Sequence, residues 1–190
     1  IDEVTSKGGA TLAWRVGKEQ ERLGQALTIE LGSLDSSVRI RYRTTARREA
    51  MQWLGPEQTA DGVAPFLFTQ GQSILTRSWI PLQDSPGVRI TYDARIRCPA
   101  GLTVVMSAHR LGRDSLGAWR LKLDQAVPPY LIALACGRLA FRSLCERCGV
   151  WAEPSVVEKA RWELEDTERM VQAAETLFGP YRWGRYDLIV

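Results

Sequence analysis

The chain has 190 residues and a formal net charge of +3, with 45% hydrophobic and 25% charged residues. This composition excludes a disordered chain, and the charge excess is too small to recruit nucleic acid or an anionic membrane. No apolar run approaches the roughly 20 residues that a membrane-spanning helix needs; the longest covers 130–136. The four cysteines and the single histidine fit a reducing compartment, so we expect a cytoplasmic protein.

The first two thirds of the chain alternate apolar and polar residues in the manner of half-buried strands. Residues 37–45 place Val38, Ile40 and Tyr42 on one face and arginines on the other, and residues 88–98 repeat this pattern. Further strands are predicted over 26–31, 102–108 and 118–124. One polar face per strand predicts antiparallel sheets, arranged as a saddle or a sandwich.

Arginines line the outward face of both alternating strands. Charged residues on such a face are usually solvated surface. A protein that binds single-stranded nucleic acid would place stacking aromatic rings among its basic residues. Tyr42 and Tyr92 fall on the inward face instead, so we expect no nucleic-acid partner.

The stretch 66–73 begins as a strand and then places Gln70 and Gln72 on either side of Gly71. Side chains alternate along a strand, so the two glutamines are expected on the same face as the preceding phenylalanines. A buried amide without a partner costs about 1–3 kcal/mol. The glutamines are therefore expected either to bond to the backbone or to face a ligand.

The last third of the chain has an α/β pattern. It predicts a strand, an amphipathic helix and a second strand, over residues 149–153, 154–178 and 186–190. Ser155 and Glu158 form a capping-box start, and Gly179 and Pro180 supply the stop. The faces of such a sheet need further elements to cover them, so we expect a piece of a longer protein.

The sequence contains no complete catalytic motif. A catalytic zinc usually needs three protein ligands, and the lone His109 is expected to be a turn residue. Cys145 and Cys148 form a C-x-x-C that could be half a zinc site or a redox pair. No second pair follows and a strand comes next, so we favour a structural role.

Six strings occur in order between residue 51 and the C-terminus: MQWLGPEQT, FLFTQGQS, IPLQDSPGVRITYDA, VPPYLIALACG, VWAEPSVVEKA and GPYRWGRYDL. Together they resemble the zinc aminopeptidase family that includes leukotriene hydrolase and aminopeptidase B. The resemblance implies that residues 1–143 are an N-terminal β domain lacking its first part. It implies that residues 144–190 begin a truncated thermolysin-like catalytic domain. The expected fold is mostly β, with antiparallel sheets followed by the β-α-β opening of an incomplete α/β domain.

The resemblance also implies a function. The intact enzyme would be a zinc-dependent metallo-aminopeptidase, a hydrolase that removes N-terminal residues from peptides. Its H-E-x-x-H zinc helix and G-x-M-E-N loop lie beyond the last string. We therefore expect zinc in the intact enzyme, but no metal site, catalytic residue or activity in this chain alone. The expected partners are a peptide substrate and the remainder of the catalytic domain.

The same resemblance implies a role for the glutamine stretch. It implies that Gln72 helps to bind the free α-amino group of the peptide, with Gly71 allowing close backbone approach. Gln70 and Ser73 would flank this pocket. Alternatively, both amides merely tie adjacent loops together, or the chain is a stand-alone β-sandwich binding module without catalysis. The family's usual G-P-R-S linker is replaced by 145–148, which implies a domain junction there; subfamily and side-chain preference stay open.

Overall fold

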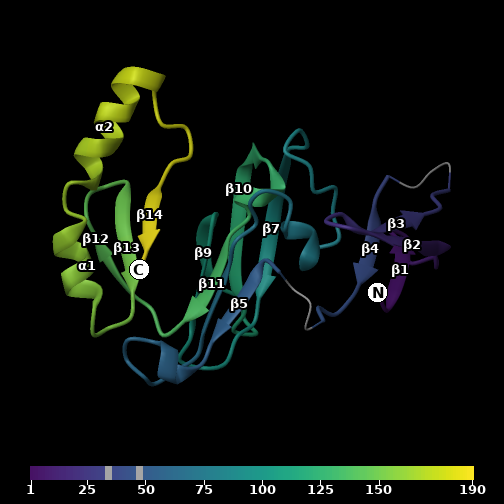
Figure 1. Ribbon diagram of the computed structural model, residues 1–190, viewed down its shortest axis with the longest axis horizontal. Helices are drawn as coiled ribbons and strands as arrows, with labels where there is room; N and C mark the ends of the chain where they lie inside the picture. Colours follow the sequence, from purple (N-terminus) through teal and green to yellow (C-terminus); the bar gives the residue numbers. More distant parts are fainter. Residues whose placement is uncertain (33–35, 46–48) are drawn as a thin grey trace.

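The computed structural model describes residues 1–32, 36–45 and 49–190 and consists mainly of β-strands (Figure 1). Strands β1 to β14 span Glu3–Ser6, Trp14–Gln20, Gly24–Ile29, Val38–Arg41, Met51–Leu54, Phe66–Thr69, Ile90–Ile96, Thr103–Met106, His109–Arg113, Trp119–Val127, Leu134–Gly137, Ala140–Ser143, Cys148–Ala152 and Tyr186–Ile189. The helices are α1 (Val157–Glu163) and α2 (Thr167–Phe178), with 3-10 turns η1 (Pro56–Gln58), η2 (Thr76–Ser78) and η3 (Pro129–Leu131). Among these residues no helix combines the length and the apolarity required to cross a bilayer.

The strands pair into five small sheets. Two have two strands, β1-β4 and β2-β3, and lie at the N-terminal end of the molecule (Figure 1). In the middle, a four-stranded sheet with the order β5-β6-β11-β8 is followed by a three-stranded sheet with the order β7-β10-β9. The sheet β12-β13-β14 lies beside the two α-helices at the opposite end. The predicted antiparallel architecture is thus confirmed, with β13 and β14 forming a parallel pair.

The main core lies between the four-stranded and three-stranded sheets. Its buried members come from β6, β8, β10 and β11 and from the turn before β11: Leu67, Val104, Met106, Leu121, Ile132, Leu134 and Cys136. The predicted alternation of β7 is confirmed, because Ile90, Tyr92, Ala94 and Ile96 are half-buried against this core while the residues between them are exposed. Arg95, the arginine of β7, lies on this exposed face, where it pairs with Asp114, so it belongs to the surface, as predicted.

A second core joins β13 to α1. Val150 and Ala152 of β13 pack against Val157 and Ala160 of α1, and all four side chains are buried. β14 then runs parallel to β13. The predicted strand–helix–strand unit is confirmed, because one face of β13 needs helical cover and the chain must cross back to add a parallel strand.

The predicted single helix over 154–178 is wrong, because the chain forms two helices. α1 ends at Glu163, and the Thr167 hydroxyl donates to the Leu164 carbonyl at 2.6 Å. A threonine that bonds locally to the backbone competes with helix continuation. The predicted capping box is also absent, since the residue at the N-cap is Val156 and no side chain caps the helix. The predicted stop is confirmed, with Gly179 at a φ of 86°.

The N-terminal strands differ most from the sequence prediction. The predicted strand 37–45 shortens to β4, and the expected inward residues Val38 and Tyr42 are exposed, because β4 pairs with β1 in a two-stranded sheet. β2, which the sequence pattern did not indicate, is exposed along its whole length. A strand without a buried face carries no alternation for sequence reasoning to find.

An arginine-centred ion-pair network attaches α2 to the β12–β13 hairpin. Arg147 lies in the hairpin turn and donates to Glu168 at 2.9 Å and to Glu175 at 2.7 Å. Both carboxylates accept forked hydrogen bonds from the same guanidinium, which lowers the pKa of Glu168 and of Glu175 to about 2. The network therefore holds one turn of the hairpin against the helix through charge.

We expect this network to make stability depend on acid pH. The two carboxyl groups have an ordinary pKa of 4.5 that falls to about 2 on folding. Their stabilising contribution is complete above pH 4.5 and is lost as the pH falls towards 2. Arg147→Met should flatten this acid limb when urea unfolding is followed across that pH range.

Arg169→Met is the matched control, because Arg169 forms an exposed pair with Asp166. It should leave the acid limb unchanged. An acid limb equally steep in the Arg147→Met protein would contradict the assignment.

Candidate functional site

The predicted glutamine stretch does not continue strand β6. The partner strand β5 begins at Met51, which pairs with Thr69, the last residue of β6. The chain turns there: the Gln70 amide donates to the Ala50 carbonyl at 2.8 Å and the Gly71 carbonyl accepts from Leu75. The expectation that both glutamines share a strand face with the phenylalanines is therefore wrong. Their positions are set by the turn.

Gly71 is buried at the centre of this turn. A Cβ at this position would come within 2.6 Å of the Thr76 hydroxyl and 2.9 Å of the Tyr130 carbonyl oxygen. Thr76 is fully buried and donates to the Pro129 carbonyl at 3.0 Å. The missing side chain thus allows a close backbone approach, and the approach is to η3 of the same chain.

The other three predicted site residues are exposed on the surface of the turn. The Gln70 side-chain oxygen accepts a hydrogen bond from the Gln72 backbone amide at 3.2 Å. A cis peptide bond joins Gln72 to Ser73. Within the described residues, the Gln72 side chain forms no hydrogen bond, so it does not tie two loops together. The turn presents a free amide group to its surroundings.

A groove of about 1060 Å³ lies between the two sheets that enclose the main core, here called the sandwich, and the sheet β12-β13-β14. Thr69 precedes the glutamine turn in sequence, and Leu131 follows Tyr130, which Gly71 contacts. Both belong to the groove wall, together with Phe68, Trp151 and Asp187. The four predicted residues at 70–73 are not among the lining residues. The structure therefore brings the predicted stretch to the end of a groove wall rather than into the groove.

The groove contains a half-buried cation, Arg110, that sequence reasoning did not single out. The Arg110 guanidinium lies 4.3 Å from the ring centre of Trp119 and 4.6 Å from that of Trp151. Burial lowers the pKa of Arg110, and its Nε has no hydrogen-bond partner among the described residues. Trp151 lies 41 positions later in the chain, so strand pairing and packing alone bring these groups together.

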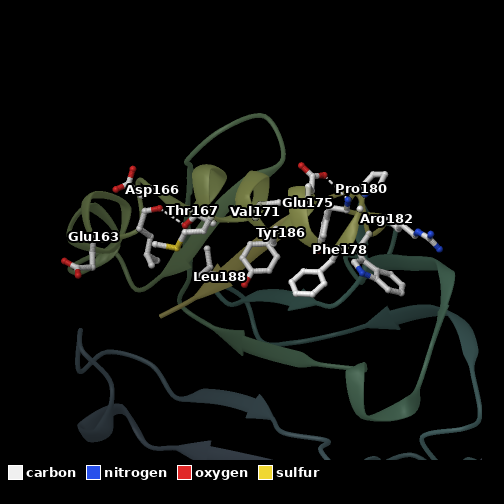
Figure 2. Close-up of a pocket in the computed structure, with 16 residues that line it drawn as sticks. Glu163, Asp166, Thr167, Val171, Glu175, Phe178, Pro180, Arg182, Tyr186 and Leu188 are labelled. Atoms are coloured by element: carbon white, nitrogen blue, oxygen red, sulfur yellow. Dashed lines mark hydrogen bonds between the residues drawn. The ribbon is translucent and has the colours of Figure 1, made fainter.

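A second hollow, of about 540 Å³, lies between α2 and β14 (Figure 2). Val171 of the helix and Tyr186 and Leu188 of the strand face it. Phe178 also lines this hollow, although its side chain is 86% exposed. The apolar face of α2 is thus covered at its start but open at its end.

The chain was compared with curated proteins, solved structures and family models. No family model matches it. It is 46% identical to aminopeptidase B of Rattus norvegicus over 72% of the chain and 21% of that protein. It is 38% identical to leukotriene A-4 hydrolase of Xenopus laevis over 88% of the chain and 27% of that protein. The chain therefore spans about a quarter of the length of these relatives.

The solved structures agree with the sequence matches. Native leukotriene A4 hydrolase of Saccharomyces cerevisiae superposes with a TM-score of 0.91 at 34% identity, covering the whole chain and 30% of that structure. An M1 zinc metallopeptidase of Deinococcus radiodurans shares the fold, with a TM-score of 0.68 at 16% identity. The chain thus has a fold class that parts of leukotriene A4 hydrolase and of this M1 zinc metallopeptidase share.

Within that class, the sequence matches define the family. The chain belongs to the zinc aminopeptidase family that includes leukotriene A-4 hydrolase and aminopeptidase B. The predicted resemblance and fold class are confirmed. The division at residues 143 and 144, which falls at the end of β12, stays a prediction.

The close packing at Gly71 predicts a stability effect. Gly71→Ala should lower the free energy of unfolding by about 1–3 kcal/mol, because the added methyl group overpacks the contact with Thr76 and Tyr130. Urea denaturation measures this change.

Gly87→Ala is the matched control, since a Cβ there meets no atom within 4 Å. It should leave stability nearly unchanged. Equal effects of the two substitutions would show that glycine at 71 is not required for packing.

Proposed function

We propose that this chain is part of a zinc-dependent aminopeptidase and supplies a wall of the cleft that binds the peptide's free α-amino group. Gln72 makes the main contact, and Gln70 and Ser73 flank it. The observation that carries this proposal is the exposed side-chain amide of Gln72, which has no hydrogen-bond partner among the described residues. It stands on a turn fixed by the buried contact between Gly71 and Thr76. Family membership supplies the reaction class.

The chemistry of the amide suits a terminal amine. An ammonium group has N–H donors that need fixed acceptors, and a side-chain amide oxygen is such an acceptor. Gln70 already accepts a hydrogen bond within the turn. Its carbonyl oxygen is therefore partly occupied, which makes Gln72 the better acceptor. The role of these residues is to anchor and position the substrate, which lowers the entropic cost of reaction.

The catalytic zinc is proposed to bind outside this chain. The sequence has one histidine, His109, and a site built on an H-E-x-x-H helix needs two. Among the described residues, the one group that combines three potential metal ligands does not include His109. The donor set of this chain therefore does not fit the catalytic zinc.

Further chain is proposed to complete the α/β domain that begins near residue 144. The support is the open end of α2, where Leu177 and Phe178 are 75% and 86% exposed. Apolar side chains of this size are normally covered in a finished domain. The proposed partners are thus a peptide and the remainder of the enzyme, in a cytoplasmic setting and without nucleic acid.

Gln72→Ala tests the binding role in the complete polypeptide that carries this chain. A hydrogen bond to a charged group contributes about 1.5–3 kcal/mol. Its loss should lower kcat/KM for an aminoacyl reporter by roughly 10- to 150-fold. Steady-state kinetics measure the change, and Gln70→Ala should have a smaller effect.

The control is Gln25→Ala in β3, a similarly exposed glutamine outside the glutamine turn. It should leave kcat/KM unchanged. A Gln72→Ala enzyme with wild-type kinetics would remove Gln72 from the site while leaving the reaction class intact.

If the catalytic zinc binds outside this chain, the 190-residue chain alone is predicted to be inactive. It should hydrolyse no aminoacyl reporter with or without added zinc, because the ligands for the catalytic metal are not in it. Release of the reporter group at a rate that follows the concentration of the chain would contradict this. A stand-alone binding module would also be inactive, but its longer form would gain no activity with zinc.

A further inference from the structure

A cluster of two thiols and a carboxylate lies at the junction between the β12–β13 hairpin and α2. Cys145 and Cys148 flank the hairpin turn, and Glu168 lies in the first turn of α2. One ligand atom from each residue lies within 4.8 Å of the other two. The proposed peptide-binding role uses none of these residues, so the inference below stands apart from it.

The two thiols of the cluster already donate to the same carboxylate oxygen. Glu168 Oε2 accepts hydrogen bonds from the Cys145 thiol at 3.1 Å and from the Cys148 thiol at 3.4 Å. In a tetrahedral zinc site, the bond lengths of about 2.3 Å to sulfur and 2.1 Å to oxygen place such atoms roughly 3.6 Å apart. The separations in the structure are close to this value, so little movement is needed to enclose an ion.

The backbone favours a thiolate at this position. The Cys148 amide donates to the Cys145 sulfur at 3.0 Å. The turn is closed by the Cys145 amide, which donates to the Cys148 carbonyl at 3.1 Å. An N–H group directed at sulfur stabilises negative charge there. The C-x-x-C turn therefore holds one ligand in place before any metal arrives.

The carboxylate is oriented by neighbours that would persist after metal binding. Glu168 Oε1 accepts from Arg147 Nη2 at 2.9 Å and from Gln172 Nε2 at 3.0 Å. Oε2 accepts from the two thiols and also from the Arg147 Nε at 3.1 Å. Ligating carboxylates in metal sites are commonly hydrogen-bonded in this manner by a second set of residues. Arg147 also supplies positive charge next to the site.

We infer that Cys145, Cys148 and Glu168 form a structural binding site for a thiophilic divalent cation, with Zn²⁺ as the metal that fits best. Binding replaces the two thiol protons, which are released to solvent, and water completes the tetrahedron. Two thiolates, one carboxylate and Zn²⁺ sum to one negative charge, and Arg147, which also pairs with Glu175, offsets part of it. The ion would fasten the hairpin to α2.

The ligand set selects this class of metal. Thiolate sulfur binds Zn²⁺ in preference to Mg²⁺ or Ca²⁺, which prefer oxygen ligands. The bound ion would serve structure because it cross-links two elements that otherwise meet through hydrogen bonds. Two metal-free arrangements are the alternatives: a hydrogen-bonded thiol pair with no metal affinity, and a Cys145–Cys148 disulfide.

Cobalt substitution tests the site in the reduced, metal-free protein. Addition of Co²⁺ should produce the near-ultraviolet absorption of a thiolate-to-cobalt charge transfer, which a site built from histidine and carboxylates lacks. Zn²⁺ should displace Co²⁺ and abolish the band, because it binds such ligands more tightly. Zn²⁺ should also protect Cys145 and Cys148 from alkylation, read by peptide mapping.

The variants separate binding from folding. Cys145→Ser should abolish the band, and because Cys145 is only partly buried, its melting temperature without metal should stay close to wild type. Arg147→Met should weaken Co²⁺ binding by about 10- to 100-fold. Cys98→Ser, at a half-buried cysteine in the sandwich, is the matched control and should keep the full band.

Three results would overturn the inference. One is the absence of a charge-transfer band in the reduced protein. Another is a band that persists in Cys145→Ser or disappears in Cys98→Ser. The third is that both cysteines of the reduced protein are alkylated at the same rate with and without Zn²⁺.

Discussion

The end of the β5–β6 ladder at the pair Met51–Thr69 is the constraint on which the candidate site depends. The Gln70 amide still bonds across to the Ala50 carbonyl, and beyond it the Gly71 carbonyl accepts from Leu75 within a turn. Gly71 packs against the backbone of η3. This turn exposes the Gln72 side chain, which has no hydrogen-bond partner among the described residues.

Strand β13 connects the sandwich to the helices because its two faces serve different cores. Val150 and Ala152 face α1, while Trp151 packs with Val105 and Leu139 on the other side. Gly149 adds to this arrangement, since a Cβ there would come within 2.2 Å of the Phe141 ring. The alternation of a single buried strand thus fixes how the α/β unit is attached to the β domain.

Ion pairs and thiol hydrogen bonds connect the β12–β13 hairpin to α2. Arg147 links the hairpin to both acidic residues of α2, and one of these, Glu168, also accepts from the two thiols. The hairpin turn is therefore an attachment point for α2. A cation bound there would cross-link the hairpin and the helix, and so would act on structure.

The sequence by itself determined the alternating strand β7, the β-α-β unit, the stop at Gly179 and the family, because these depend on local periodicity, local backbone preference and ordered strings. Tertiary structure decided what depends on partners distant in sequence. It ended β6 opposite the first residue of β5, and it placed Arg110 against both Trp119 and Trp151. It also brought Glu168 to a C-x-x-C some 20 residues earlier. Such contacts arise from strand pairing and helix packing, which no pattern within one segment can reveal.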